Sequence, residues 1–276
     1  MHVRSLALRT EIMFAAMDGE VVDRGDYVVA RTPSNPTFFW GNFIILPSAP
    51  SVSECEPGGR WVRAFQREFP EAKHLLVAWD EPHAEAFDAK PFAPLGFVPD
   101  ETSLLRFADA TPRASAWEPR HLRDDEWDAA FALLDRAMTP LNDSADGYKR
   151  FLRIQVERYR RLVARGLGAW FGVFEGGALV GTCGVFSHDG LCRFQTVAVD
   201  QTHRRRGICS ALVDHVVRHA QQRWPSQPIL IGAAPASAAE RIYLRAGFEP
   251  IEHTVALLFT DKQNTPARPG SRRTSG

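Results

Sequence analysis

The sequence lacks an apolar run long enough to span a bilayer, and its first residues lack the basic-then-apolar pattern of a secretion signal. We therefore expect a cytoplasmic protein with no membrane partner. An excess of charge is also missing, because 33 basic residues balance 33 acidic residues. A chain with no net charge offers no overall cationic surface, so we expect no nucleic-acid partner.

Cysteine is scarce, and the potential metal ligands follow no pattern. The four cysteines are Cys55, Cys183, Cys192 and Cys209. Two of them lie in apolar runs, where a thiol packs like a small apolar side chain. The nine histidines have no recurrent spacing, and the sequence therefore predicts no metal site.

The two halves of the chain repeat one order of expected elements. Each half is predicted to form a strand, a loop, a helix, a strand, a helix, a Gly-Phe pair and a last strand. The sequence LGFVP at residues 95–99 corresponds to AGFEP at residues 246–250. We therefore predict a divergent internal duplication. The expected limits are residues 1–110 for the first domain, 111–119 for a linker, 120–260 for the second domain and 261–276 for a disordered tail.

A cationic loop between an apolar strand and an amphipathic helix is the most informative stretch. Residues 197–199 are apolar, Arg204, Arg205 and Arg206 follow, and from Gly207 apolar residues recur every four positions. The first turn of a helix has unpaired backbone N–H groups and a partial positive charge. The loop therefore predicts a bound phosphate or pyrophosphate, although a solvated surface turn would have the same composition.

Two segments resemble motifs of a known family. Residues 204–209 (RRRGIC) resemble the Gln/Arg-x-x-Gly-x-Gly/Ala motif of the GNAT acetyltransferases, with Cys209 in place of the last Gly or Ala. Residues 239–248 (AERIYLRAGF) resemble the family's Ala-x-x-Leu-Tyr-x-x-x-Gly-Phe segment, although Ala236 replaces the Asn that often precedes it. The resemblance covers about residues 117–259. It implies an α/β fold with a mixed, mostly antiparallel central sheet that splays at the cofactor cleft and is flanked by helices, present twice in this chain.

The resemblance also implies a site for acetyl-CoA as cosubstrate, with no metal ion. In the family, the cationic loop grips the pyrophosphate, and the pantetheine arm pairs with the preceding strand like an added strand. The cofactor-binding residues implied here are Val197, Ala198, Val199, Arg204, Arg205, Arg206, Gly207, Ile208, Cys209 and Ser210.

Tyr243 is implied as the general acid of this site. The leaving thiolate needs a proton, and a well-placed tyrosine hydroxyl with a pKa of about 10 can donate one. The other interpretation of Tyr243 is a core aromatic residue on a helix. In the first half, Phe92 takes the corresponding position, and Glu54 and Glu56 precede the helix where the second half has arginines. We therefore expect the first domain to be a degenerate GNAT-like scaffold or substrate wall that binds no cofactor.

The sequence does not identify the general base. Gln195 lies on the right strand but cannot take a proton. Glu175, Asp189 and Asp143 are candidates as acids in loops or turns, whereas His203 is expected to be a surface or phosphate-side residue. Water that relays the proton to bulk solvent is an equal alternative.

The sequence thus predicts an N-acetyltransferase that moves an acetyl group from acetyl-CoA to a primary amine of a small molecule or protein by direct attack. The alternative is a non-catalytic CoA-binding sensor or partner-binding module. RNA contact through the basic residues 149–165 is a weaker third hypothesis, which the zero net charge disfavours. A monomer and a homodimer are both compatible with the sequence.

Overall fold

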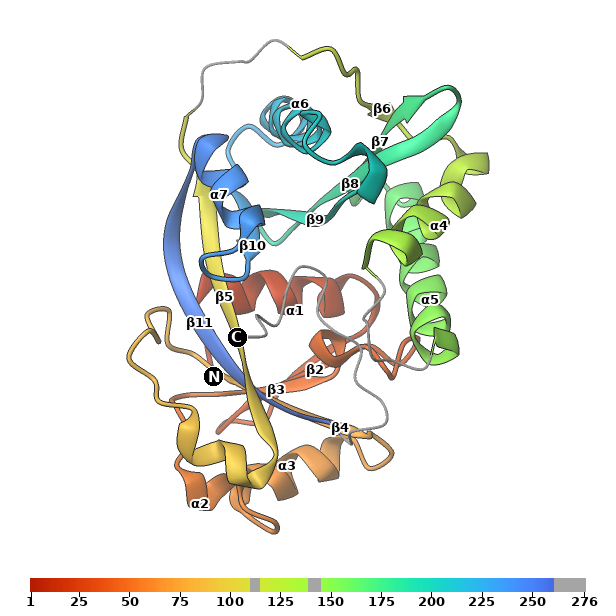
Figure 1. The fold of residues 1–276 in the computed structure, drawn as a ribbon. Coiled ribbons are helices and arrows are strands. Elements are labelled where there is room, and N and C mark those ends of the chain that lie inside the picture. The colour runs from red at the N-terminus through yellow and green to blue at the C-terminus, as the bar shows by residue number, and fades with distance from the viewer. Residues whose placement is uncertain (110–114, 139–144, 261–276) are drawn as a thin grey trace. The chain divides into compact units, whose positions relative to one another are not determined.

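The computed structural model describes residues 1–109, 115–138 and 145–260. The expected tail lies outside these residues, as does part of the expected linker. The described chain forms two compact units (Figure 1). Of the described residues, the first unit comprises Met1–Leu104 and Glu252–Thr260, and the second comprises Leu105–Ile251.

The first unit is a mixed sheet with flanking helices. Its elements are α1 (Leu6–Asp18), β1 (Glu20–Asp23), β2 (Val28–Arg31), η1 (Phe39–Gly41), β3 (Phe43–Leu46), α2 (Val52–Cys55), α3 (Arg60–Glu68), β4 (His74–Trp79), η2 (Lys90–Leu95) and the first part of β5 (Phe97–Phe107). The β1–β2 and β2–β3 pairs are antiparallel, and β3 pairs with β4 in parallel. Strands β3 and β4 are buried along their whole lengths, which explains their continuous apolar sequence.

Helix α1 is absent from the sequence prediction, because its apolar residues lie on all sides and give no amphipathic period. Its N-terminus is held by two carboxylates. Glu252 accepts hydrogen bonds from the backbone N–H groups of Leu6 and Ala7 at 2.8 and 2.9 Å. Asp80 accepts hydrogen bonds from the backbone N–H groups of Arg4 and Ser5. Negative charge at this end of a helix is stabilising.

The second unit is also a mixed sheet with flanking helices. Its elements are β6 (Arg120–His121), η3 (Asp124–Glu126), α4 (Trp127–Met138), α5 (Ala145–Ala164), β7 (Gly168–Glu175), β8 (Ala178–His188), β9 (Leu191–Val199), η4 (Gln201–His203), α6 (Ile208–Arg223), β10 (Ile229–Ala233), α7 (Ala238–Arg245) and the first part of β11 (Phe248–Thr260). The β6–β7, β7–β8 and β8–β9 pairs are antiparallel, and β9 pairs with β10 in parallel. The predicted mixed, mostly antiparallel α/β fold is therefore confirmed in both units.

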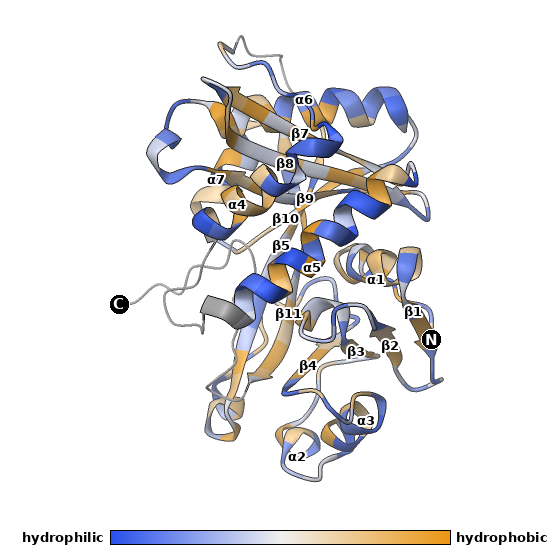
Figure 2. Ribbon diagram, turned by 90° about the vertical axis from the view of Figure 1, so that its right-hand side faces the viewer, coloured by the Kyte–Doolittle hydropathy of each residue, from blue (hydrophilic) through white to orange (hydrophobic). Residues whose placement is uncertain are grey.

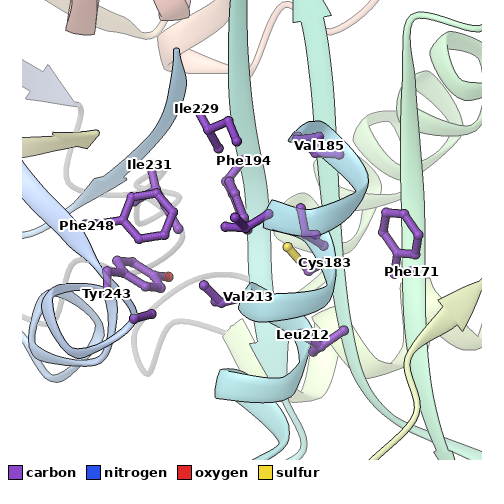
Figure 3. Packing of buried hydrophobic residues seen from close by; sticks show 14 of the residues in the cluster. Phe171, Cys183, Val185, Phe194, Leu212, Val213, Ile229, Ile231, Tyr243 and Phe248 are labelled. Atoms are coloured by element: carbon purple, nitrogen blue, oxygen red, sulfur yellow. The ribbon is translucent and has the colours of Figure 1, made fainter. Parts of the chain in front are cut away.

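The core of the second unit lies between the sheet and α6. Hydrophilic and hydrophobic residues alternate along this helix in Figure 2, so that one face is apolar. Leu212 and Val213 on that face pack with Phe171, Cys183 and other residues of the strands (Figure 3). This packing fixes the start of α6 against the sheet.

The two units repeat one order of elements, as the predicted duplication requires. Strand β3, helix α3, strand β4, η2 and strand β5 correspond to β9, α6, β10, α7 and β11. Gly96 and Gly247, which precede the last strand of each copy, have φ values of +85° and +87°. This left-handed conformation carries no steric cost for glycine.

The limits of the units differ from the expected ones at the end of β11. Residues 252–260 were expected in the second domain, but they belong to the first unit. The reason is strand pairing, because Ala256–Thr260 form an antiparallel ladder with His74–Ala78 of β4. A purely sequential division of the chain therefore assigns this strand to the wrong unit.

Candidate functional site

Strands β9 and β10 part from each other in the second unit. Their parallel register consists of Cys192 with Ile229 and Arg193 with Leu230. Strand β9 continues beyond these residues to Val199, and β10 continues to Ala233. The expected splay of the sheet therefore occurs between these two strands, and Val197, Ala198 and Val199 lie in the part of β9 beyond the paired residues.

A β-bulge lies in β9 at the same level. Thr182 of β8 is opposite Ala198, whereas Gly184 is opposite Gln195, so β9 has one extra residue between these pairs. Thr196 within the bulge has φ +51°, which is unusual for a β-branched residue. A bulge takes backbone groups out of the regular ladder. Backbone N–H groups released in this way can stabilise a developing oxyanion beside the parted strands.

The loop after β9 has a defined turn geometry. Asp200 accepts hydrogen bonds from the backbone N–H and the hydroxyl of Thr202 at 3.0 and 2.7 Å. Arg205 and Gly207 both have positive φ values, +64° and +82°, and α6 starts directly after Gly207. A Cβ atom on Gly207 would meet no atom within 4 Å, so the space beside it is open. The first-turn amides of α6, from Ile208 to Ser210, follow directly in the chain, and such amides have no partner within their own helix.

The three arginines of the loop have different roles. The Arg206 guanidinium donates hydrogen bonds to Glu175 at 3.1 and 2.5 Å and lies 5.1 Å from the ring centre of Trp117. The indole of Trp117 also donates a hydrogen bond to the Arg206 carbonyl at 2.7 Å. Arg204 and Arg205 are exposed and make no ion pair with any residue that the structure describes. Arg204, Arg205 and Arg206 remain predicted cofactor-binding residues, and in this structure Arg206 is paired with Glu175.

Glu175 is a poor candidate for the general base in this arrangement. It lies at the end of β7 and also contacts His203, whose Nε2 is 2.9 Å from the carboxylate. Hydrogen bonds from Arg206, followed by those from His203, lower the pKa of Glu175. A carboxylate held in its charged form by these partners fastens the loop rather than taking up a proton.

The other candidate bases do not converge on the bulge. Asp189 is in the turn before β9, and the bulge is near the other end of that strand. His203 contacts Thr202 and Glu175 within the loop. Gln195 donates a hydrogen bond from its side-chain amide to the Tyr159 hydroxyl at 2.6 Å. Asp143 lies outside the described residues.

Tyr243 is on α7 and is almost completely buried, with 6% of its surface exposed. It belongs to the apolar cluster that includes Ile231 and Phe248. Figure 3 shows its ring beside Phe248 and its hydroxyl directed toward α6. Burial, followed by the nearby thiols of Cys209 and Cys183, raises the pKa of Tyr243 well above its usual value. The hydroxyl therefore keeps its proton at neutral pH.

The corresponding strands of the first unit do not part. Strands β3 and β4 stay paired to their last residues, Leu46 and Trp79. Beyond them, Trp79, Phe87 and Phe92 form a chain of ring contacts, with centroids 4.5 and 5.5 Å apart. Aromatic side chains thus fill the end of this strand pair, and Phe92 is the residue that corresponds to Tyr243.

Trp117 and Tyr159 contact the site, although the sequence analysis did not single them out. Their apolar rings look like core residues in the sequence, and their polar contacts depend on the bulge and on the loop geometry.

Within the described ranges, no group of three or more His, Cys, Asp or Glu residues could hold a metal ion. In the same ranges, no helix has the length and hydropathy needed to cross a membrane.

Comparison of the sequence with known proteins identifies a matching family and a relative. Residues 122–248 match the acetyltransferase (GNAT) family. An uncharacterized N-acetyltransferase of Streptomyces coelicolor is 30% identical over 142 residues, which cover 48% of this chain and 31% of that protein. The match thus spans less than a third of that relative's length.

Several solved structures share the fold over both units. A functionally unknown conserved protein from Staphylococcus epidermidis has a TM-score of 0.67 and 16% identity, covering 89% of this chain and 95% of that one. A GCN5-related N-acetyltransferase from Kribbella flavida has a TM-score of 0.58 and 16% identity, covering 93% and 96%. The strand opening, the loop at Gly207 and the match of residues 122–248 agree, and this region of the chain is similar to the acetyltransferase (GNAT) family.

Proposed function

We propose that the second unit moves an acetyl group from acetyl-CoA to a primary amine of a small molecule or a protein. The observation that carries this proposal is the parting of β9 from β10 directly before the Gly207 loop. A strand edge with unpaired backbone groups suits the amide-containing pantetheine arm. The first turn of α6 at the end of that edge suits the pyrophosphate.

The residues divide into an anion-binding part and a strand-edge part. The backbone N–H groups of residues 208–210 would bind the pyrophosphate oxygens, and the exposed Arg204 and Arg205 would supply charge. Arg206 and Glu175 would keep the loop in shape. The backbone of Val197, Ala198 and Val199 would pair with the pantetheine amides.

The chemistry is a direct attack of the neutral amine on the thioester carbonyl. The N–C bond forms, and the carbonyl oxygen takes up the electron pair of the π bond. Backbone N–H groups at the bulge around Thr196 would stabilise this oxyanion. The electron pair of the oxyanion then re-forms the C=O bond as the C–S bond breaks, and the Tyr243 hydroxyl gives its proton to the departing sulfur. The proton that the amine loses goes to solvent, directly or through ordered water, and Tyr243 regains a proton from solvent.

The alternative is a CoA-binding sensor without turnover, and the burial of Tyr243 in an apolar cluster is the observation that favours it. Release of free thiol from acetyl-CoA across a panel of amines tests both functions. The proposed enzyme should release thiol faster with at least one class of amine than in buffer alone. Tight acetyl-CoA binding by calorimetry, with no thiol release for any amine in the panel, would favour the sensor.

A further inference from the structure

A buried tyrosine of α5 reaches the bulge of β9. Tyr159 is 2% exposed, and its hydroxyl accepts the hydrogen bond from the Gln195 amide. Gln195 directly precedes Thr196 and is opposite Gly184 of β8, so it lies at the edge of the bulge. Tyr159 therefore holds the residue from which the bulge begins.

The conformation of Thr196 needs such support. A β-branched residue with φ +51° is in an unfavourable region of backbone space, and such residues persist only where the surrounding structure holds them. The bulge also lies where β9 leaves its pairing with β10, so the parallel neighbour cannot hold it there. The support must come from the neighbouring strand β8 and from helix α5, which carries Tyr159.

Trp170 connects Tyr159 to β8. The two rings are stacked, with centroids 4.8 Å apart and an interplanar angle of 27°. The indole N–H of Trp170 donates a hydrogen bond to the Thr182 hydroxyl at 2.7 Å. A Cβ atom on Gly184 would lie 2.3 Å from the indole, so only glycine allows this approach. Thr182 and Gly184 are the two β8 residues that bracket the bulge, and both contact Trp170.

We propose that Tyr159 is a positioning residue for acetyl transfer, because its hydroxyl holds Gln195, the residue directly before Thr196, and thereby sets the direction of the backbone N–H groups in the β9 bulge. This inference rests on the proposed function of the same site. Tyr159 touches neither acetyl-CoA nor the amine, and it acts only through β9. Burial raises the pKa of Tyr159, so the hydroxyl stays protonated and can both donate and accept.

Tyr159→Phe tests the proposal, because it removes one oxygen and keeps the ring that stacks on Trp170. We expect kcat to fall about tenfold or more while the KM for acetyl-CoA changes by less than about threefold, since the lost alignment acts in the transition state. Hydrogen–deuterium exchange at the backbone amides of residues 195–198 should become faster. Gln195→Met should have the same effect, and the double variant should be no worse than the poorer single variant.

Tyr27→Phe is the matched control in the first unit. Tyr27 is also 2% exposed, and its hydroxyl is hydrogen-bonded to Glu68 and Arg67. The control should lower the melting temperature as Tyr159→Phe does but leave kcat and β9 exchange unchanged. The proposal would be overturned if Tyr159→Phe left kcat and the hydrogen–deuterium exchange of β9 unchanged. It would also be overturned if both variants lost kcat to the same extent. The exchange measurement needs no turnover, so a chain that acetylates no amine would disprove the proposed function and still report on Tyr159.

Discussion

The Glu175 carboxylate at the end of β7 holds the Arg206 guanidinium through two hydrogen bonds of 3.1 and 2.5 Å. The contact fastens the loop to the β7–β8 hairpin and neutralises one of its three positive charges. All three arginines of the run are exposed, but among the described residues only Arg206 is held in an ion pair. This division leads to different expectations for variants at neighbouring positions.

Replacement of Arg204 should weaken acetyl-CoA binding more than replacement of Arg206. A charged hydrogen bond to phosphate contributes about 1.5–3 kcal/mol, so Arg204→Met should raise the Kd about tenfold or more. Arg206→Met should raise the Kd less and should mainly lower the melting temperature, because its guanidinium is already paired. Calorimetry on both variants measures the difference. An equal or larger loss of affinity for Arg206→Met would contradict the assignment.

Gly207→Glu should abolish tight binding of acetyl-CoA. The new side chain would add negative charge to the anion site and would need a φ of +82°, which L residues rarely adopt. We expect the Kd to rise by at least about thirtyfold, equivalent to about 2 kcal/mol. Gly190→Glu is the matched control, because Gly190 also has positive φ and open space but lies in the turn before β9. Calorimetry that shows equal affinities in the two folded variants would contradict this prediction.

Tyr243→Phe should keep the fold and the affinity for acetyl-CoA, because only one oxygen is lost. If the hydroxyl protonates the departing thiolate, kcat should fall by at least about a hundredfold, the usual lower value for general acid catalysis. The KM for acetyl-CoA should change little. Steady-state thiol release with the preferred amine is the measurement. Turnover near the wild-type rate would mean that Tyr243 is a packing residue and that the sulfur takes its proton from another group.

The first unit should bind no CoA. Its strands β3 and β4 stay paired to their last residues, Leu46 and Trp79, and the Trp79 ring packs on Phe87. Calorimetric titration of the full chain with acetyl-CoA should therefore give one site per chain, and Gly207→Glu should remove it. If Gly207→Glu still bound one acetyl-CoA per chain, the cofactor site would lie elsewhere in the chain.

The free energy of unfolding should decrease as the pH is lowered through the mildly acidic range, because of a histidine cluster in the second unit. His121, His215 and His219 surround Phe171, and their rings lie within about 5 Å of it. Burial is the main cause that lowers the pKa of all three, and the charges of the other histidines, Arg218 and Arg223 also contribute for the α6 pair.

The sign follows from proton uptake. Below a pH of about 6.5 these histidines bind protons in the unfolded chain but remain neutral in the folded chain. The free energy of unfolding therefore decreases as the pH falls from about 6.5 through the lowered pKa values. Urea unfolding at pH 7.5 and 5.5 measures the slope. Replacement of all three histidines by Gln should flatten it, and an unchanged slope in that variant would exclude the cluster as the cause.

Local sequence patterns predicted those parts of the fold that local physics determines. The hairpins at Gly176 and Gly190, the start of α6 at Gly207 and the strand at residues 74–79 follow from turn chemistry and from apolar periodicity. The cationic loop was found for the same reason, since its charge and its glycine are adjacent in the chain.

The features that the sequence did not reveal depend on contacts between distant segments. The β9 bulge is defined only by its register against β8, and the engagement of Arg206 depends on Glu175, which is far from it in the sequence. Helix α1 has no amphipathic period, so only its burial in the folded unit explains its composition. Residues 20–31 form the hairpin β1–β2, with Gly25 at φ +88° in the turn, and this pairing too depends on contacts between separate segments.

The pairing of β4 with the end of β11 has a consequence for how the protein is made. Strand β4 leaves the ribosome early, but its antiparallel neighbour, Ala256–Thr260, is among the last described residues to be synthesised. Until then the nascent first unit has an exposed, strongly apolar strand edge, which is a site for misassociation. The first unit can therefore complete its sheet only after β11 has been synthesised, and ribosome-bound chains that stop before β11 should depend on chaperones to remain unaggregated.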